Sequence, residues 1–435
     1  MKTSLHNEPH ITRAVGRTRW VVVFWLLLGG IINYLDRTTL SIAAPEMMKD
    51  LNLTNTHIGL LGSAFSWTYA LMQLPSGWLI DRLGAKKVYS WAVALWSAAT
   101  AFTGLCTNMT MLVFSRIFLG ATEAPCWPGG AKITASWFPK KERALATGFW
   151  DAASKWGPTI APPLLVALIV PFGWRALFFI TGGLGLIFVI FFIFFYRQPE
   201  DHPKLSQEEY EYIKSDGGGT AETITESKVS WGSLFKHKSV WGMILGFFCY
   251  VWMMNIFTTF LPLYLMKTQN VSMSSLGIYA SIPWFGGVIG AVLGGYVTKY
   301  LVDRGTAKPM VAKRALISVC AVLAGLTVII LPHITSLAGT LTLLTIALVL
   351  LSAFSSSAWA LPGDVAPSSM VASVGSIQNF GGYFGGALSP LVVGMIADIT
   401  GSYTMAFTSG GIIAACAALC YWFIVRKPIV ESENE

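Results

Sequence analysis

Twelve long apolar runs dominate the sequence, and most of them are separated by short polar loops. We place the runs near residues 20–41, 56–80, 88–106, 109–131, 144–170, 176–196, 240–266, 274–298, 315–333, 336–361, 371–398 and 403–425. A helix of about 20 apolar residues crosses the roughly 30 Å hydrocarbon core of a bilayer. Because that core offers backbone groups no hydrogen-bond partner, a chain crosses it as helices or as a closed barrel. The runs therefore predict an all-α integral membrane protein with twelve transmembrane helices.

The composition suits a bilayer better than water. Hydrophobic residues make up 54% of the chain and charged residues 12%, whereas a soluble domain has about 25% charged residues. The sequence contains no cluster of metal-ligand residues, no nucleophile and base pair and no nucleotide-binding loop. We therefore expect a carrier without a metal site, and we regard a membrane enzyme or a receptor as a weaker interpretation.

The basic residues are distributed unevenly between the two sets of loops. If the N-terminus is cytoplasmic, 23 of the 30 Lys and Arg residues fall in cytoplasmic segments, and only Lys49, Arg175 and Lys267 fall on the opposite side. Positive charge gathers on the cytoplasmic side of membrane proteins. We therefore expect a multi-pass protein of a bacterial inner (plasma) membrane with both termini in the cytoplasm. The net charge of +8 then needs no nucleic-acid partner.

One long polar connection divides the apolar runs into two sets of six. It contains a run of charged residues and a Gly triplet, and a short helix is predicted at 205–214. Two six-helix halves are typical of transporters that bind their substrate near the membrane midplane, between the repeats. The predicted segments are an N-terminal tail (1–19), the first half (20–196), a cytoplasmic linker (197–239), the second half (240–425) and a C-terminal tail (426–435).

The loop after the second run carries a motif with a clear physical role. Its glycines, Gly77 and Gly84, allow close packing and a tight reversal, while Asp81 and Arg82 can form an ion-pair latch. The motif resembles the loop signature of the major facilitator superfamily, which implies that fold and a gating role for these four residues. The equivalent place in the second half has Lys299 where an acid is expected, which disfavours a second latch.

Charged residues lie inside several of the predicted spans, and those of the first and fourth spans form two clusters. A charge at the centre of a span costs roughly 2.5–3.5 kcal/mol, so those that remain are candidates for function. Tyr34 and Arg37 share one face of the first span and could bind a carboxylate together, and the adjacent Asp36 and Arg37 lower each other's cost. Arg116 and Glu123 are seven residues apart and share a face of the fourth span. The alternative is a set of ion pairs that only clamp the helices.

Several motifs sharpen the resemblance within the superfamily. They are residues 33–37 in the first span, 116–125 in the fourth, 136–139 with 142–143 in the following loop, and 173–175 before the sixth span. These residues resemble the anion:cation symporter family, which includes bacterial permeases for hexuronates, aldonates and aldarates. The resemblance covers residues 20–427, and the segment 374–380 is most similar to the aldonate branch. It is specific for the family and weak for the substrate.

The resemblance implies roles for individual residues. Tyr34 and Arg37 match the substrate-binding residues of galactonate carriers, and Asp36 and Glu123 match acids that take up protons. The further residues that it places at the substrate are Tyr69, Ser356, Trp359, Gln378 and Asn379. Amides and hydroxyls suit the hydroxyls of a sugar acid, and an aromatic face suits its C–H side. Each polar residue could instead be a bridge between helices.

The fifth span departs from the aldonate pattern. Near Ser154 those carriers have an uncharged amide or hydroxyl, whereas here Asp151 and Lys155 are four residues apart. If Lys155 points into the cavity, a third cation joins Arg37 and Arg116, which would favour a dianion. We therefore count Arg116, Ser154 and Lys155 among the expected substrate-binding residues. The alternative is that Asp151 and Lys155 neutralise each other without contacting substrate.

Energetics then suggest the kind of transport. Importing an anion against a negative interior costs about 2.3 kcal/mol per charge per 100 mV, so uptake needs a coupled cation. The six histidines lie in tails, loops or span ends, which leaves Asp36 and Glu123 as proton acceptors. We expect a monomer in membrane lipid that carries a small organic anion, most simply a sugar acid, with the proton as coupling ion and no cofactor. Uptake of another carboxylate, such as an aromatic acid or a dicarboxylate, and export by antiport are the alternatives.

Overall fold

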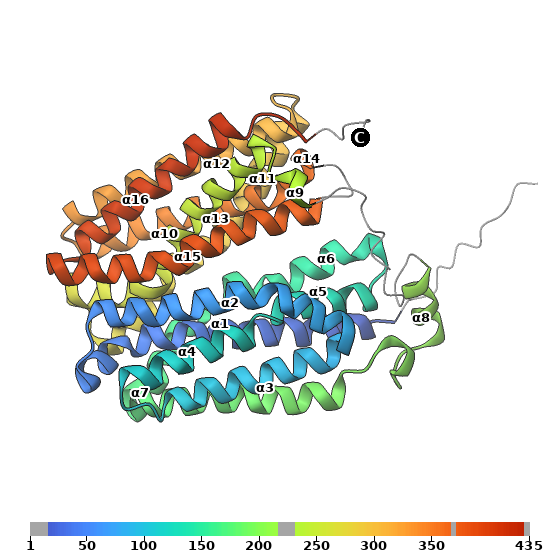
Figure 1. The fold of residues 1–435 in the computed structure, drawn as a ribbon, viewed down its shortest axis with the longest axis horizontal. Coiled ribbons are helices and arrows are strands. Elements are labelled where there is room, and N and C mark those ends of the chain that lie inside the picture. Colours follow the sequence, from blue (N-terminus) through green and yellow to red (C-terminus); the bar gives the residue numbers. More distant parts are fainter. Residues whose placement is uncertain (1–15, 216–230, 367–370, 430–435) are drawn as a thin grey trace, which may run out of the picture.

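The computed structural model describes residues 16–215, 231–366 and 371–429, and in these ranges every regular element is helical. Figure 1 shows two bundles of long helices. The first contains α1 (Thr18–Leu51), α2 (Asn55–Leu83), α3 (Ala85–Thr103), α4 (Met109–Glu123), α5 (Cys126–Trp137), α6 (Lys140–Asp151) and α7 (Ala153–Phe195). The second contains α10 (Lys238–Thr268), α11 (Met273–Asp303), α12 (Pro309–Ile330), α13 (Leu337–Ala360), α14 (Pro362–Val365), α15 (Val371–Thr400) and α16 (Tyr403–Leu419), which continues into a π-helix (Cys420–Ile424). Short helices are η1 (Pro199–Asp201), α8 (Gln207–Lys214), α9 (Trp231–Leu234) and η2 (Leu331–His333).

Each of the twelve predicted spans overlaps a helix or a pair of helices. In the described part of the chain, eight helical stretches are long and apolar enough to cross a membrane. One of them, Ala146–Phe195, covers both the fifth and the sixth predicted span, because the helix continues through a kink at Gly173. Spans two, three and four, at α2, α3 and α4–α5, fall outside that set and stay predictions. The all-α membrane fold is confirmed.

One break interrupts a span that the sequence predicts as continuous, and one kink lies between two predicted spans. The fourth span is divided into α4 and α5 at Ala124 and Pro125, where proline lacks the N–H that would continue the hydrogen-bond ladder. Gly173 has φ 75°, a left-handed conformation that favours glycine, and it turns the first arm of α7 into the second. The polar segment predicted at 205–214 forms α8, and residues 216–230 of the linker lie outside the described ranges.

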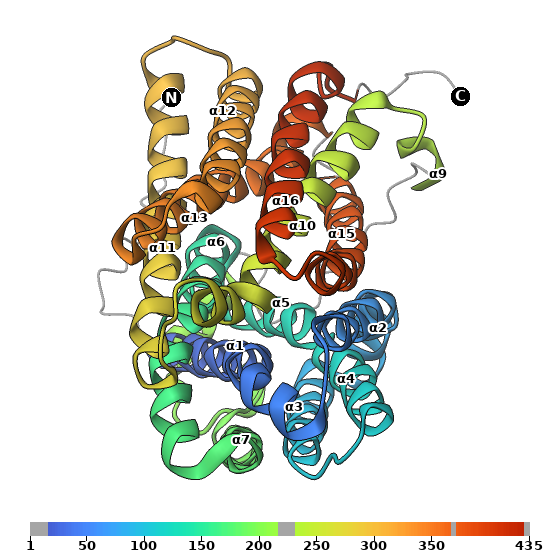
Figure 2. The ribbon, with the colours of Figure 1, turned by 90° about the vertical axis from the view of Figure 1, so that its left-hand side faces the viewer.

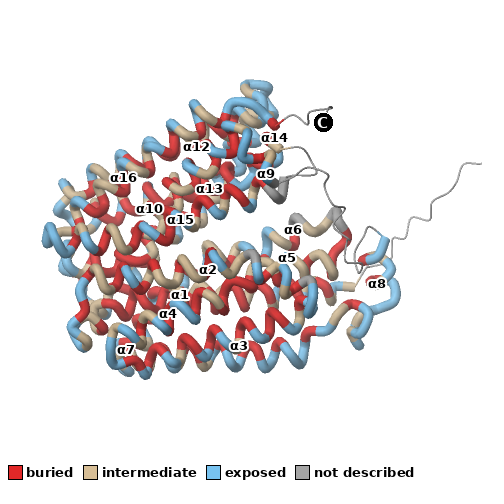
Figure 3. Tube along the Cα trace, viewed as in Figure 1, coloured by how far each residue is buried: buried red, intermediate tan, exposed pale blue. Residues whose placement is uncertain are grey.

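Large apolar side chains cover the outside of the bundles. In Figure 3 buried residues line the interior of each bundle, and exposed ones alternate along the outer faces of the helices. Phe194 on α7 is 69% exposed, and Val319 and Leu326 on α12 are about half exposed. Soluble monomers rarely expose apolar surface on this scale. The outer faces of these helices are therefore suited to lipid.

The two bundles touch at the end of the molecule opposite the termini, which we call the far end. Viewed from that end in Figure 2, α15 lies beside α2 and α11 beside α7. Gly59 packs so closely on Pro390 that a β-carbon there would collide with the proline backbone. The ribbons diverge toward the opposite end, the terminal end, where α8 and α14 lie (Figure 1). The halves are thus closed against each other at the far end.

Asp398 of α15 caps the N-terminus of α2 in the other half. Its Oδ1 accepts hydrogen bonds from the backbone and side-chain nitrogens of Asn55, at 3.0 and 2.7 Å. Its Oδ2 accepts from the backbone nitrogen of Thr56 at 2.7 Å and from its hydroxyl at 2.5 Å. Lys267 and Tyr403 both donate to the Asn55 side-chain oxygen. A carboxylate at a helix N-terminus also interacts favourably with the helix dipole, so this contact fastens the halves together.

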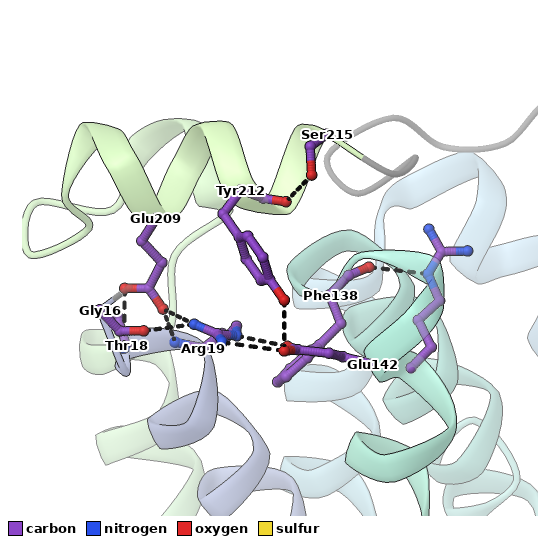
Figure 4. A network of polar contacts seen from close by, with 9 residues as sticks. Gly16, Thr18, Arg19, Phe138, Glu142, Glu209, Tyr212 and Ser215 are labelled. Atoms are coloured by element: carbon purple, nitrogen blue, oxygen red, sulfur yellow. Dashed lines mark hydrogen bonds and ion pairs between the residues drawn. The ribbon is translucent and has the colours of Figure 1, made fainter. Parts of the chain in front are cut away.

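At the terminal end, α8 is fastened to the first half (Figure 4). The buried carboxylate of Glu209 accepts from the backbone nitrogens of Thr18 and Arg19, both at 3.2 Å. Arg19 lies between two acids, with 3.0 Å to Glu209 and 3.0 Å to Glu142. Tyr212 donates to Glu142 at 2.8 Å. The first part of the linker is therefore a structural part of the first half.

Replacing Asp398 with Ala should open the far end. The hydrogen bonds to this carboxylate exist only while the far end is closed. Their loss should destabilise the closed state by about 1 kcal/mol or more, which changes the ratio of closed to open molecules roughly fivefold. Electron–electron resonance between spin labels at the exposed positions Thr107 and Ser274, one in each half, should then show a longer-distance population. Asp364→Ala is the control, because its partner Lys313 lies in the same half. Identical distance distributions in both variants and the parent would contradict this role.

Candidate functional site

A cavity of about 1020 Å³ lies between the two halves. Helices α1, α2, α4, α5, α6 and α7 line it on one side, and α10, α11, α13 and α15 line it on the other. Such a volume suits a small molecule, since ligand pockets are typically about 300–1,000 Å³. No described group of three His, Cys, Asp or Glu residues is arranged to hold a metal ion.

The two walls of the cavity differ in charge. Of the described lining residues, the charged ones all belong to the first half: Arg37, Arg116, Asp151 and Lys155. The second half contributes amides, hydroxyls and aromatic rings, which include Asn255, Thr258, Trp284, Ser352, Ser355, Ser356, Trp359, Asn379 and Tyr383. One wall can therefore bind anionic groups, and the other can pair with hydroxyls.

Arg37 is held on the charged wall by one acid and three aromatic rings. Its Nε donates to Glu123 of α4 at 2.8 Å. The guanidinium carbon lies 5.3 Å from the ring centre of Tyr34, 5.2 Å from Phe65 and 4.6 Å from Tyr69. Its Nη2 has no hydrogen-bond partner among the described residues. Arg37 therefore keeps donors for a ligand while Glu123 fixes its orientation, and Tyr34 shares its face of α1 as expected.

Gly157 allows α7 to approach this part of α1. A β-carbon at Gly157 would collide with Tyr34, and one at Gly30 would lie 2.7 Å from the Ala153 side chain. The close approach brings the start of α7 against α1. Asp151, Ser154 and Lys155 consequently lie at the cavity beside Tyr34.

Asp36 is adjacent to Arg37 in sequence but does not pair with it. The Asp36 side chain is completely buried and lies beside Trp96 and Thr100 of α3. Neither of its carboxylate oxygens has a hydrogen-bond partner in the described part of the protein. Consecutive residues of a helix point about 100° apart, so Asp36 turns toward α3 while Arg37 turns toward Glu123. The expectation that these two neighbours compensate each other's charge is corrected.

Arg116 lies deeper than Arg37. Only 3% of it is exposed, although it borders the cavity, and its guanidinium carbon lies 5.8 Å from the ring centre of Phe178. Its Nε and Nη2 have no hydrogen-bond partner among the residues described. Glu123, seven residues on, pairs with Arg37 and forms no ion pair with Arg116 in this structure. Arg116 therefore contributes positive charge to the charged wall of the cavity, but it exposes little surface that a ligand could contact.

The structure brings most of the predicted substrate residues together. Tyr34, Arg37, Tyr69, Arg116, Ser154, Lys155, Ser356, Trp359 and Asn379 all line the cavity. Gln378 does not line it, because its side chain is buried between helices and donates to the Ala358 carbonyl at 3.1 Å. It also accepts from Tyr421 at 3.4 Å, which makes it a bridge between α15 and the π-helix.

The predicted gating residues lie at the end of α2 that faces the terminal end. Gly84 has φ 87°, which is the tight reversal expected of glycine. Gly77 has open space around it, so close packing does not require a glycine there in this state. Arg82 lies over the ring of Trp78, 5.1 Å from its centre. The side chain of Asp81 is outside the described part, so the ion-pair latch stays a prediction.

Some cavity residues escaped the sequence analysis. Tyr383 of α15 packs on Tyr69 with ring centres 5.0 Å apart. The group of aromatic rings around Arg37 therefore includes a contact with the second half. Asn255 and Trp284 also line that half, and Trp127 lines the first. Asn255 is a polar amide in an otherwise apolar run, so the sequence alone could have indicated it. The aromatic residues could not be recognised in this way, because the spans contain many aromatic residues that face lipid.

Comparison with known proteins identifies the family. The model of the Major Facilitator Superfamily matches residues 26–390. The chain belongs to this superfamily.

Several relatives are described as transporters of sugar acids, which is consistent with the anion:cation symporter family. One from Escherichia coli (strain K12), described as "Probable L-galactonate transporter", is 36% identical and covers 97% of this chain and 92% of its own. A second from the same organism, described as "Probable galactarate/D-glucarate transporter", is 32% identical and covers 94% and 95%. A bacterial homologue of the human lysosomal transporter Spinster, solved in an inward-facing and occupied conformation, has TM-score 0.77 at 20% identity over 96% of this chain and 100% of that chain. This likeness to the Spinster homologue concerns the fold alone.

The family and the described relatives show that the chain is a membrane transporter and not an enzyme.

Two isosteric substitutions should affect stability differently. Glu123→Gln removes the charge that compensates Arg37 and should lower the free energy of unfolding by about 1–3 kcal/mol. Asp36→Asn removes a carboxylate that has no hydrogen bond here, so it should leave the stability unchanged or raise it. Thermal unfolding of the purified variants in one detergent measures both. An equal loss of stability in the two variants would show that the Arg37–Glu123 contact stabilises the fold no more than the Asp36 carboxylate does.

Proposed function

We propose that the chain takes up a sugar acid together with protons across the inner membrane of a bacterial cell. The observation that supports this most is the division of the cavity into a cationic wall and a wall of amides, hydroxyls and aromatic rings. A sugar acid has one anionic end and a chain of hydroxyls, so its two parts match the two walls. The names of the relatives, which refer to galactonate and to galactarate or D-glucarate, support the same substrate class.

The carboxylate of the substrate binds at Arg37. The guanidinium group belongs to a residue that lines the cavity, and the rings of Tyr34 and Tyr69, which also line it, lie around that group. The hydroxyls of the substrate pair with Asn379, Ser356 and the neighbouring polar groups of the second half. Trp359, which is half exposed at the cavity, covers the C–H face of the sugar chain. Because both halves contribute, the substrate is bound best when they close around it.

Glu123 couples the proton to this binding. It occupies the Nε of Arg37, and when ionised it offsets the charge that would attract a carboxylate. A proton on Glu123 releases Arg37 from that competition, so protonation and substrate binding favour each other. Asp36, buried beside the same cluster, is the second proton acceptor. An anion that moves inward with at least one proton no longer works against the membrane potential.

The terminal end faces the cytoplasm in this proposal. Lys49, Arg175 and Lys267 are the loop cations assigned to the opposite side, and they lie at the far end, where Arg175 pairs with Asp50 and Lys267 contacts Asn55. The other loop cations in the described part of the chain, such as Arg82, Arg304 and Arg426, lie at or next to helix ends at the terminal end, as the positive-inside rule expects. The structure then represents a state closed to the outside, and the protein works as a monomer in lipid. Export of cationic drugs is disfavoured, because Arg37 and Lys155 would repel them.

Replacing Arg37 with Lys should weaken substrate binding strongly. Lysine keeps the charge but loses the planar fork that binds a carboxylate with two hydrogen bonds. We expect the dissociation constant for galactonate to rise at least about tenfold, measured by calorimetry on purified protein. Arg426→Lys, at an exposed arginine of the terminal end, is the control and should bind normally. Wild-type affinity in the Arg37 variant would remove Arg37 from the site.

Replacing Glu123 with Gln should separate exchange from accumulation. The amide imitates the protonated acid permanently, so substrate binding and counterflow in proteoliposomes should persist. The variant cannot release a proton at this position, so accumulation driven by a pH gradient should fail. Glu211→Gln, on the exposed face of α8, should retain both activities. A Glu123 variant that still concentrates substrate would place proton coupling elsewhere, with Asp36 and then Asp151 as the next candidates.

A further inference from the structure

Two charges at the cavity take no part in the binding described above. Asp151 and Lys155 are four residues apart where α6 passes into α7, and both line the cavity. No salt bridge within 4.0 Å joins them, and neither forms an ion pair with another described residue. The expected mutual neutralisation by direct contact is therefore absent in this structure. The Lys155 ammonium group remains available to a ligand.

The position of Lys155 relative to Arg37 follows from the packing of α1 on α7. Gly30 contacts Ala153, and Tyr34 contacts Gly157, so the two helices run parallel with a constant offset. Lys155 consequently lies level with the middle of this stretch of α1, about five residues before Arg37. At a rise of 1.5 Å per residue, the two backbone positions differ by about 7–8 Å along the axis. Two long side chains with that separation can bind the two ends of one extended six-carbon molecule.

The uncharged wall of the second half limits where a second anionic group of the substrate can bind. The described lining residues of the second half carry no charge, so a second carboxylate would find its cation only in the first half. Arg116 is almost completely buried, and Arg37 binds the first carboxylate. Lys155 is therefore the cation available to the second one.

We propose that Lys155 binds a second anionic group and makes the chain select dianionic sugar acids, the aldarates, over monoanionic aldonates. This inference rests on the proposed function, because it assumes that Arg37 binds the first carboxylate. It deepens that function by naming the residue that binds the second carboxylate of the substrate. The two buried acids, Asp36 and Glu123, can supply the two protons that would make the import of a dianion electroneutral.

Asp151 provides an internal check with the opposite sign. It lies on the same face of the helical segment as Lys155 and is exposed to the cavity. Its charge lowers the attraction of this region for a carboxylate, while its oxygens can accept hydrogen bonds from substrate hydroxyls. Removing the charge of Asp151 should therefore increase the preference for a dianion, whereas removing that of Lys155 should abolish it. A purely structural role of the two residues predicts no such opposition.

Calorimetry with galactarate and galactonate tests the proposal, because these molecules share the same hydroxyl chain and differ only in the group at C6. The measured quantity is the ratio of their dissociation constants, galactonate over galactarate. In the unmodified protein this ratio should be about ten or more, the effect of one charge-assisted hydrogen bond. Lys155→Met should reduce it to about one, Lys155→Arg should preserve it, and Asp151→Asn should raise it.

Three results would overturn the inference. They are a ratio near or below one in the unmodified protein, an unchanged ratio in Lys155→Met, and a fall of the ratio in Asp151→Asn. The Arg37→Lys variant separates this failure from failure of the proposed function, because it should weaken both ligands and leave the ratio largely unchanged. A protein that binds neither sugar acid would contradict the proposed function, and this inference with it. Because a ratio compares two ligands on the same sample, partial unfolding of a variant does not imitate the expected change.

Discussion

The contact between Arg37 and Glu123 is the interaction on which the site depends. It joins α1 to α4 across 2.8 Å inside a structure whose outer faces suit lipid, where an unpaired charge is expensive. The rings of Tyr34, Phe65 and Tyr69 surround the guanidinium and leave one side of it toward the cavity. An anion that enters competes with Glu123 for the same cation. A proton that neutralises Glu123 therefore changes the affinity for the anion, and the reverse holds by thermodynamic linkage.

The rest of the fold makes this competition useful by placing the site between two bodies that can separate. At the far end, Asp398 caps the first turn of α2 and fastens the halves. At the terminal end, Glu209 caps the first turn of α1 but stays within one half. A carboxylate at a helix N-terminus thus serves two purposes here. One fastens an interface that must open during transport, and the other holds the linker helix to the body with which it moves.

The sequence predicts the components of the site better than their pairing. Hydrophobic length and the cost of buried charge are local quantities, so the spans, Tyr34, Arg37 and Glu123 could be recognised. The direction of Asp36 depends on α3, and the burial of Gln378 depends on the π-helix, so neither follows from helix periodicity alone. Asp398 and Asn55 are 343 residues apart, and no local pattern links them. The kink at Gly173 falls between the fifth and sixth predicted spans, so the sequence located it, although not that helical residues continue directly on both sides of it.

The central claim is that one cation is shared between a titratable acid and the substrate carboxylate. Its most direct test is the number of protons bound with each substrate. Calorimetric titration of the purified protein with galactonate at neutral pH, repeated in buffers of different ionisation enthalpy, measures that number. The account predicts a net uptake of protons from the buffer on binding. Heats that do not depend on the buffer would mean that binding leaves protonation unchanged, and they would contradict it.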